Sequence, residues 1–143
     1  FVRYVHEGYY SDGEFYRTGT PDNQPDNNVK IEVVQSRASP ERADELFPPI
    51  LLERTSVTGL THLNGSVTMA REGPDTAQDE FAICIGDQPE LDFGGARNPD
   101  GQGFAVVGRV VEGMDVIREI QAQPANGQSV IEPIRIQRAV RLE

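Results

Sequence analysis

The sequence is poor in the residues that most often build metal sites and covalent cross-links. It contains no tryptophan, one cysteine and two histidines in 143 residues. Because Cys84 is alone, an intramolecular disulfide is excluded, and its place within a predicted strand favours a packing role. His6 and His62 fall on a predicted helix and a predicted loop, with no His/Cys/carboxylate pattern that has metal-ligand spacing. We therefore expect neither a metal ion nor a cofactor.

Long apolar runs and an excess of basic residues are also missing. No apolar run exceeds about five residues, whereas a membrane-spanning helix needs about 20. The 13 Lys and Arg residues against 23 Asp and Glu residues give a net charge of −10, which disfavours nucleic acid and anionic membrane surfaces as partners. The length and the hydrophobic content of 37% predict one globular domain, residues 1–143, with a buried core.

A strand–turn–strand pattern lies between residues 65 and 92, and the rest of the chain can be ordered around it. Val67 and Met69 alternate with small or polar residues before the turn at Gly73-Pro74-Asp75. Period two on both sides of such a turn predicts two half-buried strands. The second strand has two faces, which carry Phe81, Ile83 and Ile85 toward a core and Glu80, Ala82 and Cys84 toward a possible ligand.

The remaining segments also favour a mainly β protein. Alternating residues predict strands at 14–19, 29–35, 50–53, 104–111 and 134–142. Apolar residues at helical spacing predict a helix at the start of the chain and another at 113–121, and Ser39-Pro40 predicts a short helix at 40–47. Polar loops lie at 20–28 and 93–103. This pattern is typical of a closed antiparallel β-barrel capped by two or three α-helices.

Four motifs in order resemble the cyclophilins, a family of peptidyl-prolyl cis-trans isomerases. The central motif is MA-x-x-GP-x-T, followed by F-x-IC and then LD. Phe15-Tyr16-Arg17 resembles the family's Phe-His-Arg, and Val34-Gln35 resembles the end of its Phe-Met-x-Gln-Gly-Gly strand. Residues 107–115 resemble its Phe-Gly-x-Val-x-x-Gly-Met-Asp run. The resemblance spans the chain from Phe1 to about Leu142, is of the bacterial type, and implies the cyclophilin-like barrel.

The resemblance further implies that the domain is N-terminally incomplete. In cyclophilins, two strands and the first part of a helix precede the position of Phe1. We expect the barrel to lack those two strands and to expose strand edges in their place.

The resemblance gives Arg17 and Gln35 a catalytic role. An arginine in a strand is most often a surface residue, but the arginine of this motif lies over the substrate proline. Rotation about the Xaa-Pro amide breaks its resonance, whose barrier is about 18–20 kcal/mol, and makes the proline nitrogen pyramidal. A guanidinium donor aimed at that nitrogen, or at the adjoining carbonyl, stabilises the twisted state over either planar state.

The family's proline pocket is matched only in part. The resemblance places substrate contacts at Tyr16, Val33, Ala70, Arg71, Glu80, Ala82, Leu91 and Phe104. Ala82 stands where the family has a pocket phenylalanine, which weakens proline binding by about 1–3 kcal/mol if nothing else fills the space. Glu80, with Glu32 and Glu90, is expected to surround Arg17 with negative charge, either locking it in an ion pair or favouring a basic peptide.

Two functions remain open at this point. The leading one is a peptidyl-prolyl cis-trans isomerase that acts as a monomer, without a cofactor, on proline-containing peptides or unfolded proteins. The other is a cyclophilin-like module that binds proline-containing segments with little catalysis, for which the altered pocket is the reason. The compartment is left open between the bacterial periplasm and the cytoplasm.

Overall fold

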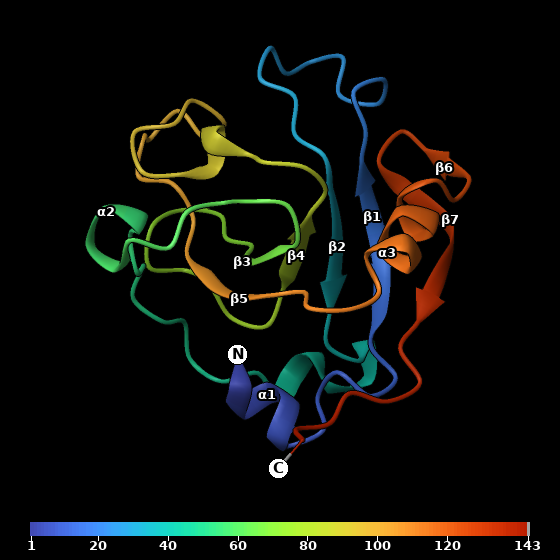
Figure 1. The fold of residues 1–143 in the computed structure, drawn as a ribbon. Helices are drawn as coiled ribbons and strands as arrows, with labels where there is room; N and C mark the ends of the chain where they lie inside the picture. Colours follow the sequence, from blue (N-terminus) through green and yellow to red (C-terminus); the bar gives the residue numbers. More distant parts are fainter. Residues whose placement is uncertain (143) are drawn as a thin grey trace.

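The computed structural model describes residues 1–142 as one antiparallel sheet with short helices around it (Figure 1). The strands lie in the order β5-β3-β4-β2-β1-β7-β6. Their bounds are β1 Glu14–Gly19, β2 Val33–Arg37, β3 Ser66–Met69, β4 Phe81–Cys84, β5 Val106–Arg109, β6 Ala125–Asn126 and β7 Ser129–Arg135. The helices are α1 Val2–His6, α2 Thr55–Thr58 and α3 Met114–Gln121, with 3-10 segments η1 Pro40–Glu45 and η2 Pro89–Leu91.

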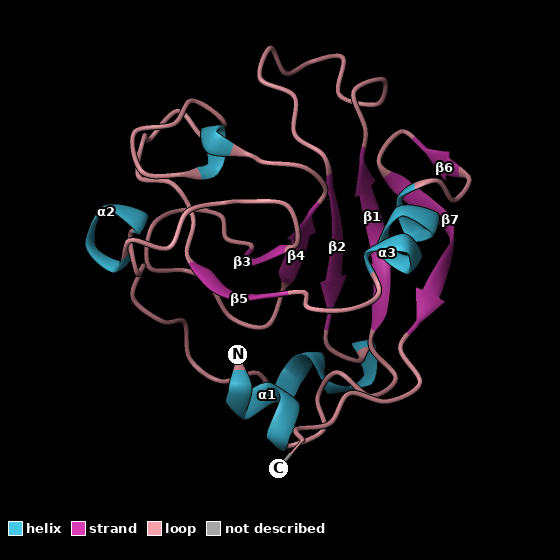
Figure 2. Cartoon of the chain, viewed as in Figure 1, coloured by secondary structure: helices cyan, strands magenta, loops and turns pink. Residues whose placement is uncertain are grey.

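The predicted fold class, mainly β and antiparallel with two or three α-helices, is confirmed (Figure 2). The predicted range 1–143 includes Glu143, which lies outside the described residues. Within residues 1–142, β5 and β6 are the two ends of the strand order.

Strand β4 lies inside the sheet and is buried on both faces. Phe81 and Ile83 face the main core, whereas Ala82 and Cys84 join a second apolar cluster. The predicted alternation is therefore confirmed, with both faces covered rather than one. Burial raises the pKa of the Cys84 thiol to about 12, so this cysteine is protonated at neutral pH and packs as predicted.

Helix α1 and the turn after it supply the aromatic part of the main core. Tyr4, Tyr9 and Tyr10 are all buried, and the Tyr10 ring meets the Phe81 ring edge to face with centroids 5.0 Å apart. Such pairs add about 0.5–1.5 kcal/mol to the burial of their area. A helix of five residues is unstable alone, so these ring contacts hold α1 in place.

Helix α3 packs its apolar side against β1 and β2 (Figure 1). Ile117 and Ile120 are buried, Met114 packs on the core, and Val116 on the opposite side is exposed. The predicted helix at 113–121 and its apolar stripe are confirmed, with Gly113 as the residue before the first turn at φ +98°.

Strand β2 begins later than the alternation predicted, at Val33 rather than residue 29. The side chain of Gln24 replaces the missing sheet partner. Its Nε2 donates to the Ile31 carbonyl at 2.7 Å, and its Oε1 accepts from the Ile31 N–H at 3.2 Å. A buried amide thus satisfies the backbone where no neighbouring strand is present.

Four other segments differ from the predictions, and the first is the strand predicted at 104–111, which is β5 at Val106–Arg109. The strand predicted at 50–53 is a single bridge between Ile50 and Ala77. The helix predicted at 40–47 is a 3-10 segment ending at Glu45, and Ser39 makes no side-chain cap. The closing strand β7 occupies Ser129–Arg135 rather than 134–142, because its partner β1 ends the pairing at Glu14.

Candidate active site

A pocket of about 180 Å³ opens on the second face of the sheet, beside β2, β3 and β4. Its apolar wall is formed by Ile31, Val33, Ala82, Leu91 and Phe104. Gln35 and Thr68 both pair with Ala82 in the sheet, which places these three residues in one row across the strands. The pocket therefore combines an apolar wall with the polar side chains of Gln35 and Thr68.

A β-bulge in β1 brings two consecutive side chains to Gln35. Phe15 pairs with Ser36 and Arg17 pairs with Gln35, so Tyr16 has no opposite residue on β2. In a regular strand Tyr16 and Arg17 would point to opposite faces. With the extra residue, the hydroxyl of Tyr16 and the guanidinium of Arg17 both reach the Gln35 side chain.

Arg17 is held by two amide side chains and keeps free donors. Its Nε donates to Gln128 Oε1 at 2.7 Å, and its Nη1 donates to Gln35 Oε1 at 2.7 Å. Among residues 1–142, Nη2 has no protein partner and the guanidinium forms no ion pair. A positioned cation with unused N–H groups thus lines an apolar pocket.

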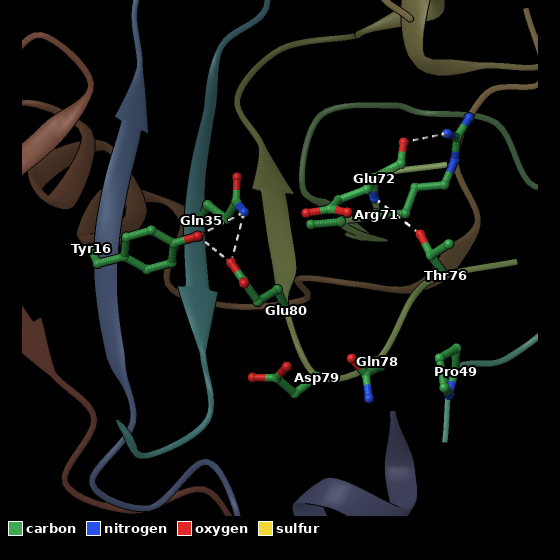
Figure 3. Close-up of a pocket in the computed structure, with 10 residues that line it drawn as sticks. Tyr16, Gln35, Pro49, Arg71, Glu72, Thr76, Gln78, Asp79 and Glu80 are labelled. Atoms are coloured by element: carbon green, nitrogen blue, oxygen red, sulfur yellow. Dashed lines mark hydrogen bonds between the residues drawn. The ribbon is translucent and has the colours of Figure 1, made fainter. Parts of the chain in front are cut away.

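Gln35 connects Arg17 to Glu80. The Gln35 Nε2 donates to Glu80 Oε1 at 3.0 Å and to the Tyr16 hydroxyl at 3.1 Å, and that hydroxyl donates to the same carboxylate oxygen (Figure 3). Burial raises the pKa of Tyr16 well above its usual range, and the hydrogen bond to Glu80 raises it further. Tyr16 is therefore a neutral donor at physiological pH.

The expectation that Glu80, Glu32 and Glu90 surround Arg17 with negative charge is wrong. Glu80 reaches Arg17 only through Gln35, and no ion pair joins them in the described part of the chain. Glu32 accepts from the Gln121 amide of α3 at 3.1 Å, and Glu90 accepts from the Ala96 N–H at 2.8 Å. Neither Glu32 nor Glu90 lines the pocket.

The structure brings most of the predicted site residues together. Eight of the ten line the 180 Å³ pocket, namely Arg17, Val33, Gln35, Ala70, Arg71, Ala82, Leu91 and Phe104. The other two, Tyr16 and Glu80, line a larger adjoining pocket of about 400 Å³. Gln35, Ala70 and Arg71 belong to both pockets, so the ten positions form one continuous surface.

Arg71 lines both pockets but uses its donors within the protein. Its guanidinium makes two hydrogen bonds to the Gly103 carbonyl, two to the Asp100 carboxylate and one to the Glu72 carbonyl. It also lies 4.6 Å from the centroid of the Phe104 ring. Because its five N–H groups are occupied, Arg71 fixes the end of the 93–103 loop and the Phe104 ring beside the pocket.

A buried hydrogen-bonded chain lies beneath the pocket. His62 Nδ1 is 2.6 Å from Asp92 Oδ1, and its Nε2 is 2.8 Å from Thr68 Oγ1. Burial lowers the pKa of His62, although Asp92 acts in the opposite direction. The Asp92 carboxylate accepts from His62 Nδ1, and the Thr68 hydroxyl lies between His62 Nε2 and the Ala105 carbonyl, to which it donates at 3.2 Å. These contacts fix the rotamer of Thr68, a pocket residue.

Several pocket residues were missed by the sequence analysis. Ile31 and Thr68 share a strand face with predicted residues, so period-two alternation was the signal that could have found them. Arg97 and Asn98 of the 93–103 loop, and Gln128 beside Arg17, carried no such signal. Only the path of the loops in space brings them to the site.

The arrangement suits the binding and polarisation of an uncharged group next to an apolar ring. Within residues 1–142, no three His, Cys, Asp or Glu side chains are placed to hold a metal ion. None of the helices in that range is long and apolar enough to cross a membrane. A small apolar pocket with one aligned guanidinium is able to orient a substrate and stabilise a change in its electron distribution without covalent chemistry.

Comparison with known families gives a match over nearly the whole chain. Residues 1–141 match the family described as cyclophilin type peptidyl-prolyl cis-trans isomerase/CLD. The chain is 31% identical over 128 residues to a peptidyl-prolyl cis-trans isomerase A of Dickeya dadantii, covering 88% of this chain and 60% of that protein. It is 27% identical over 130 residues to peptidyl-prolyl cis-trans isomerase B of Escherichia coli, covering 90% and 72%.

Solved structures show the same fold. A crystal structure of a Cryptosporidium parvum cyclophilin type peptidyl-prolyl cis-trans isomerase superposes with a TM-score of 0.67 at 17% sequence identity, covering 100% of this chain and 82% of that one. A second structure of that Cryptosporidium parvum protein, determined in the presence of the dipeptide Ala-Pro, gives a TM-score of 0.66.

Proposed function

Because the chain belongs to the cyclophilin-type peptidyl-prolyl cis-trans isomerase family, we propose that it catalyses rotation about Xaa-Pro peptide bonds. The observation that carries the proposal is the position of Arg17. Its guanidinium is held by Gln35 and Gln128, keeps Nη2 without a protein partner in residues 1–142, and lines a small apolar pocket.

The proposed mechanism follows from these contacts. The pocket wall accepts the proline ring, and its volume of about 180 Å³ suits a side chain rather than a larger ligand. When the amide twists, the proline nitrogen gains a lone pair that the planar amide does not offer. An Arg17 N–H then stabilises the twisted state more than either planar state, and Gln35 holds the guanidinium in line.

The substrates we propose are proline-containing peptides and unfolded or flexible protein segments. The Cryptosporidium parvum structure supports this substrate class, since it was determined in the presence of the dipeptide Ala-Pro. The mechanism requires no cofactor and no second chain, so we propose a single domain that acts as a monomer.

A catalytically weak binding module is the second candidate. Ala82 and Val33 are small for the wall of an apolar ring pocket, and Phe104 is only partly buried. Such a wall would hold a proline loosely, so that segments bind with little acceleration of rotation.

A protease-coupled assay with a short Xaa-Pro peptide separates the two candidates. The isomerase predicts a cis-to-trans rate that increases linearly with protein concentration. The binding module predicts an unchanged rate together with peptide binding, which is measurable as shifts of amide NMR signals near Arg17. A protein that neither accelerates rotation nor binds the peptide would contradict both functions.

A further inference from the structure

A second arginine, Arg97, lines the same pocket as Arg17. It belongs to the 93–103 loop, which is outside the strands, and it is half-buried. Arg97 Nη1 donates to Gln24 Oε1 at 2.7 Å and to the Val29 carbonyl at 2.6 Å. Hydrogen bonds from the 93–103 loop to residues 24 and 29 thus hold the Arg97 guanidinium at the pocket.

Gln24, which accepts a hydrogen bond from Arg97, is itself held by two further hydrogen bonds. Gln24 is 2% exposed and donates from Nε2 to the Thr20 and Ile31 carbonyls, both at 2.7 Å. Because both Nη1 protons of Arg97 are used, Nε and Nη2 are the donors left for a ligand. Neither has a partner among residues 1–142.

The pocket carries two positive charges that no ion pair offsets. Neither Arg17 nor Arg97 pairs with a carboxylate in the described residues, and the neighbouring Glu90 accepts from the Ala96 N–H instead. Arg71, in contrast, is neutralised by Asp100 at 2.9 Å. Burial lowers the pKa of Arg97, and the charge of Arg17 lowers it further, so the two guanidinium groups act on each other.

This positive charge stands out in a chain whose net charge is −10. The positive charge of Arg97 also lies on one side of the pocket, next to the residues that precede β2. Arg97 lies at the Ile31 end through Val29 and Gln24, whereas the adjoining acidic pocket with Glu72, Asp79 and Glu80 begins at Gln35. A peptide whose proline fills the apolar pocket would therefore meet opposite charges on its two sides.

We propose that Arg97 selects substrates that carry a carboxylate on one of the two residues flanking the proline. The proposal rests on the proposed function, because it names the substrate class of the same site. The free Nε and Nη2 of Arg97 form a planar pair of donors, which matches the two oxygens of a carboxylate.

The test compares four peptides by NMR exchange spectroscopy, which follows the rotation without a protease. Glu is placed directly before or directly after the proline, and each peptide has a partner with Gln at the same position. We expect one Glu peptide to exceed its Gln partner by about three- to tenfold in kcat/KM, the size of a partly buried ion pair. The preference should decrease at high ionic strength.

Three variants assign the preference to Arg97. Arg97→Gln should abolish the Glu-over-Gln ratio, and Arg97→Lys should retain part of it because the charge remains. Arg118→Gln on the exposed side of α3 removes the same charge elsewhere, and its ratio should equal that of the parent. Thermal unfolding of each variant establishes that the sheet is intact.

The outcomes separate this inference from the proposed function. If rotation is accelerated for all four peptides without a Glu preference, or if the preference survives in Arg97→Gln, the role of Arg97 is contradicted while the isomerase stands. If none of the peptides is accelerated, the proposed function fails. In that case, Glu peptides that bind no more tightly than Gln peptides would contradict the role of Arg97 as well.

Discussion

Gln35 accepts a hydrogen bond from Arg17 through Oε1 at 2.7 Å while its other amide atom, Nε2, donates to Glu80 at 3.0 Å. A carboxylate only accepts, so Glu80 determines which way the Gln35 amide faces. The oxygen of Gln35 is thereby turned toward Arg17. Glu80 thus acts on the guanidinium through an intervening amide rather than through an ion pair.

Removing the Glu80 carboxylate should weaken catalysis through Gln35. In Glu80→Ala, the Gln35 amide keeps only the Tyr16 hydroxyl as an acceptor for Nε2, so Arg17 is less firmly aligned and kcat/KM should fall about tenfold. Glu80→Gln keeps an acceptor oxygen for Gln35 and Tyr16 and should stay within about threefold of the parent. Both variants are measured in the protease-coupled assay. Equal rates in parent and Glu80→Ala would show that the orientation of Gln35 is irrelevant to turnover.

Arg17→Ala should remove most isomerase activity and leave the sheet folded. Loss of one aligned transition-state donor typically lowers the rate about 10²–10³-fold. Arg17→Lys should restore little, because a single ammonium nitrogen lacks the planar fork by which Nε and Nη1 contact Gln128 and Gln35. The matched control is Arg118→Ala on the exposed side of α3. A turnover in Arg17→Ala equal to that of the control would rule out Arg17 as the acting group.

Ser36→Ala should stabilise the protein or leave its stability unchanged. Ser36 is fully buried on β2, and its hydroxyl is the one buried side-chain polar atom without a hydrogen-bond partner in residues 1–142. Its removal relieves a desolvation cost of about 1 kcal/mol and leaves only a small cavity. Urea unfolding measures the difference. A loss of more than about 1 kcal/mol would indicate that the hydroxyl has a partner in solution.

His62 should make the protein less stable as the pH falls. Its pKa is lowered by burial, so the folded state keeps it neutral below pH 6.5, where the unfolded chain binds a proton. The stability from this group is full above about pH 6.5 and is lost as the pH falls toward the lowered pKa.

The measurement compares unfolding free energies of the parent and His62→Gln between pH 7.5 and 5. The parent should lose up to about 1.4 kcal/mol per pH unit more than the variant below pH 6.5. Carboxylates that do not contact residue 62 contribute equally to both proteins, so the difference in slope reports on His62 together with its partner Asp92. Parallel curves would mean that His62 is protonated in the folded state as easily as in the unfolded chain.

Shortening the 93–103 loop should leave the sheet folded. The Gly94 N–H donates to the Gly101 carbonyl at 2.8 Å, so residues 95–100 are removable with the ends already adjacent. Losing Asp100 leaves Arg71 without its carboxylate, and we expect a cost of about 1–3 kcal/mol with unfolding still cooperative. Thermal unfolding followed by circular dichroism tests this. A non-cooperative transition would contradict this prediction, because it would mean that the loop contributes to the packed core.

Local patterns in the sequence were sufficient for the regular elements and for much of the pocket. The strand at 14–19 and the helix at 113–121 have the predicted bounds to within a residue, because their periodicity coincides with real burial. The alternation in β4 correctly separated the core face from the pocket face. The motifs around Arg17 and Gln35 lie on the paired strands β1 and β2, so their relative placement follows from strand pairing.

The tertiary structure alone decided how those residues act. The bulge at Tyr16 depends on the register with both neighbouring strands, which no local pattern specifies. The exclusion of Glu32 and Glu90 from the pocket, and the arrival of Arg97 and Gln128, depend on where irregular loops turn. Loop paths are set by single long-range hydrogen bonds, such as that of Arg97 to Gln24, and such bonds leave no periodic trace in the sequence.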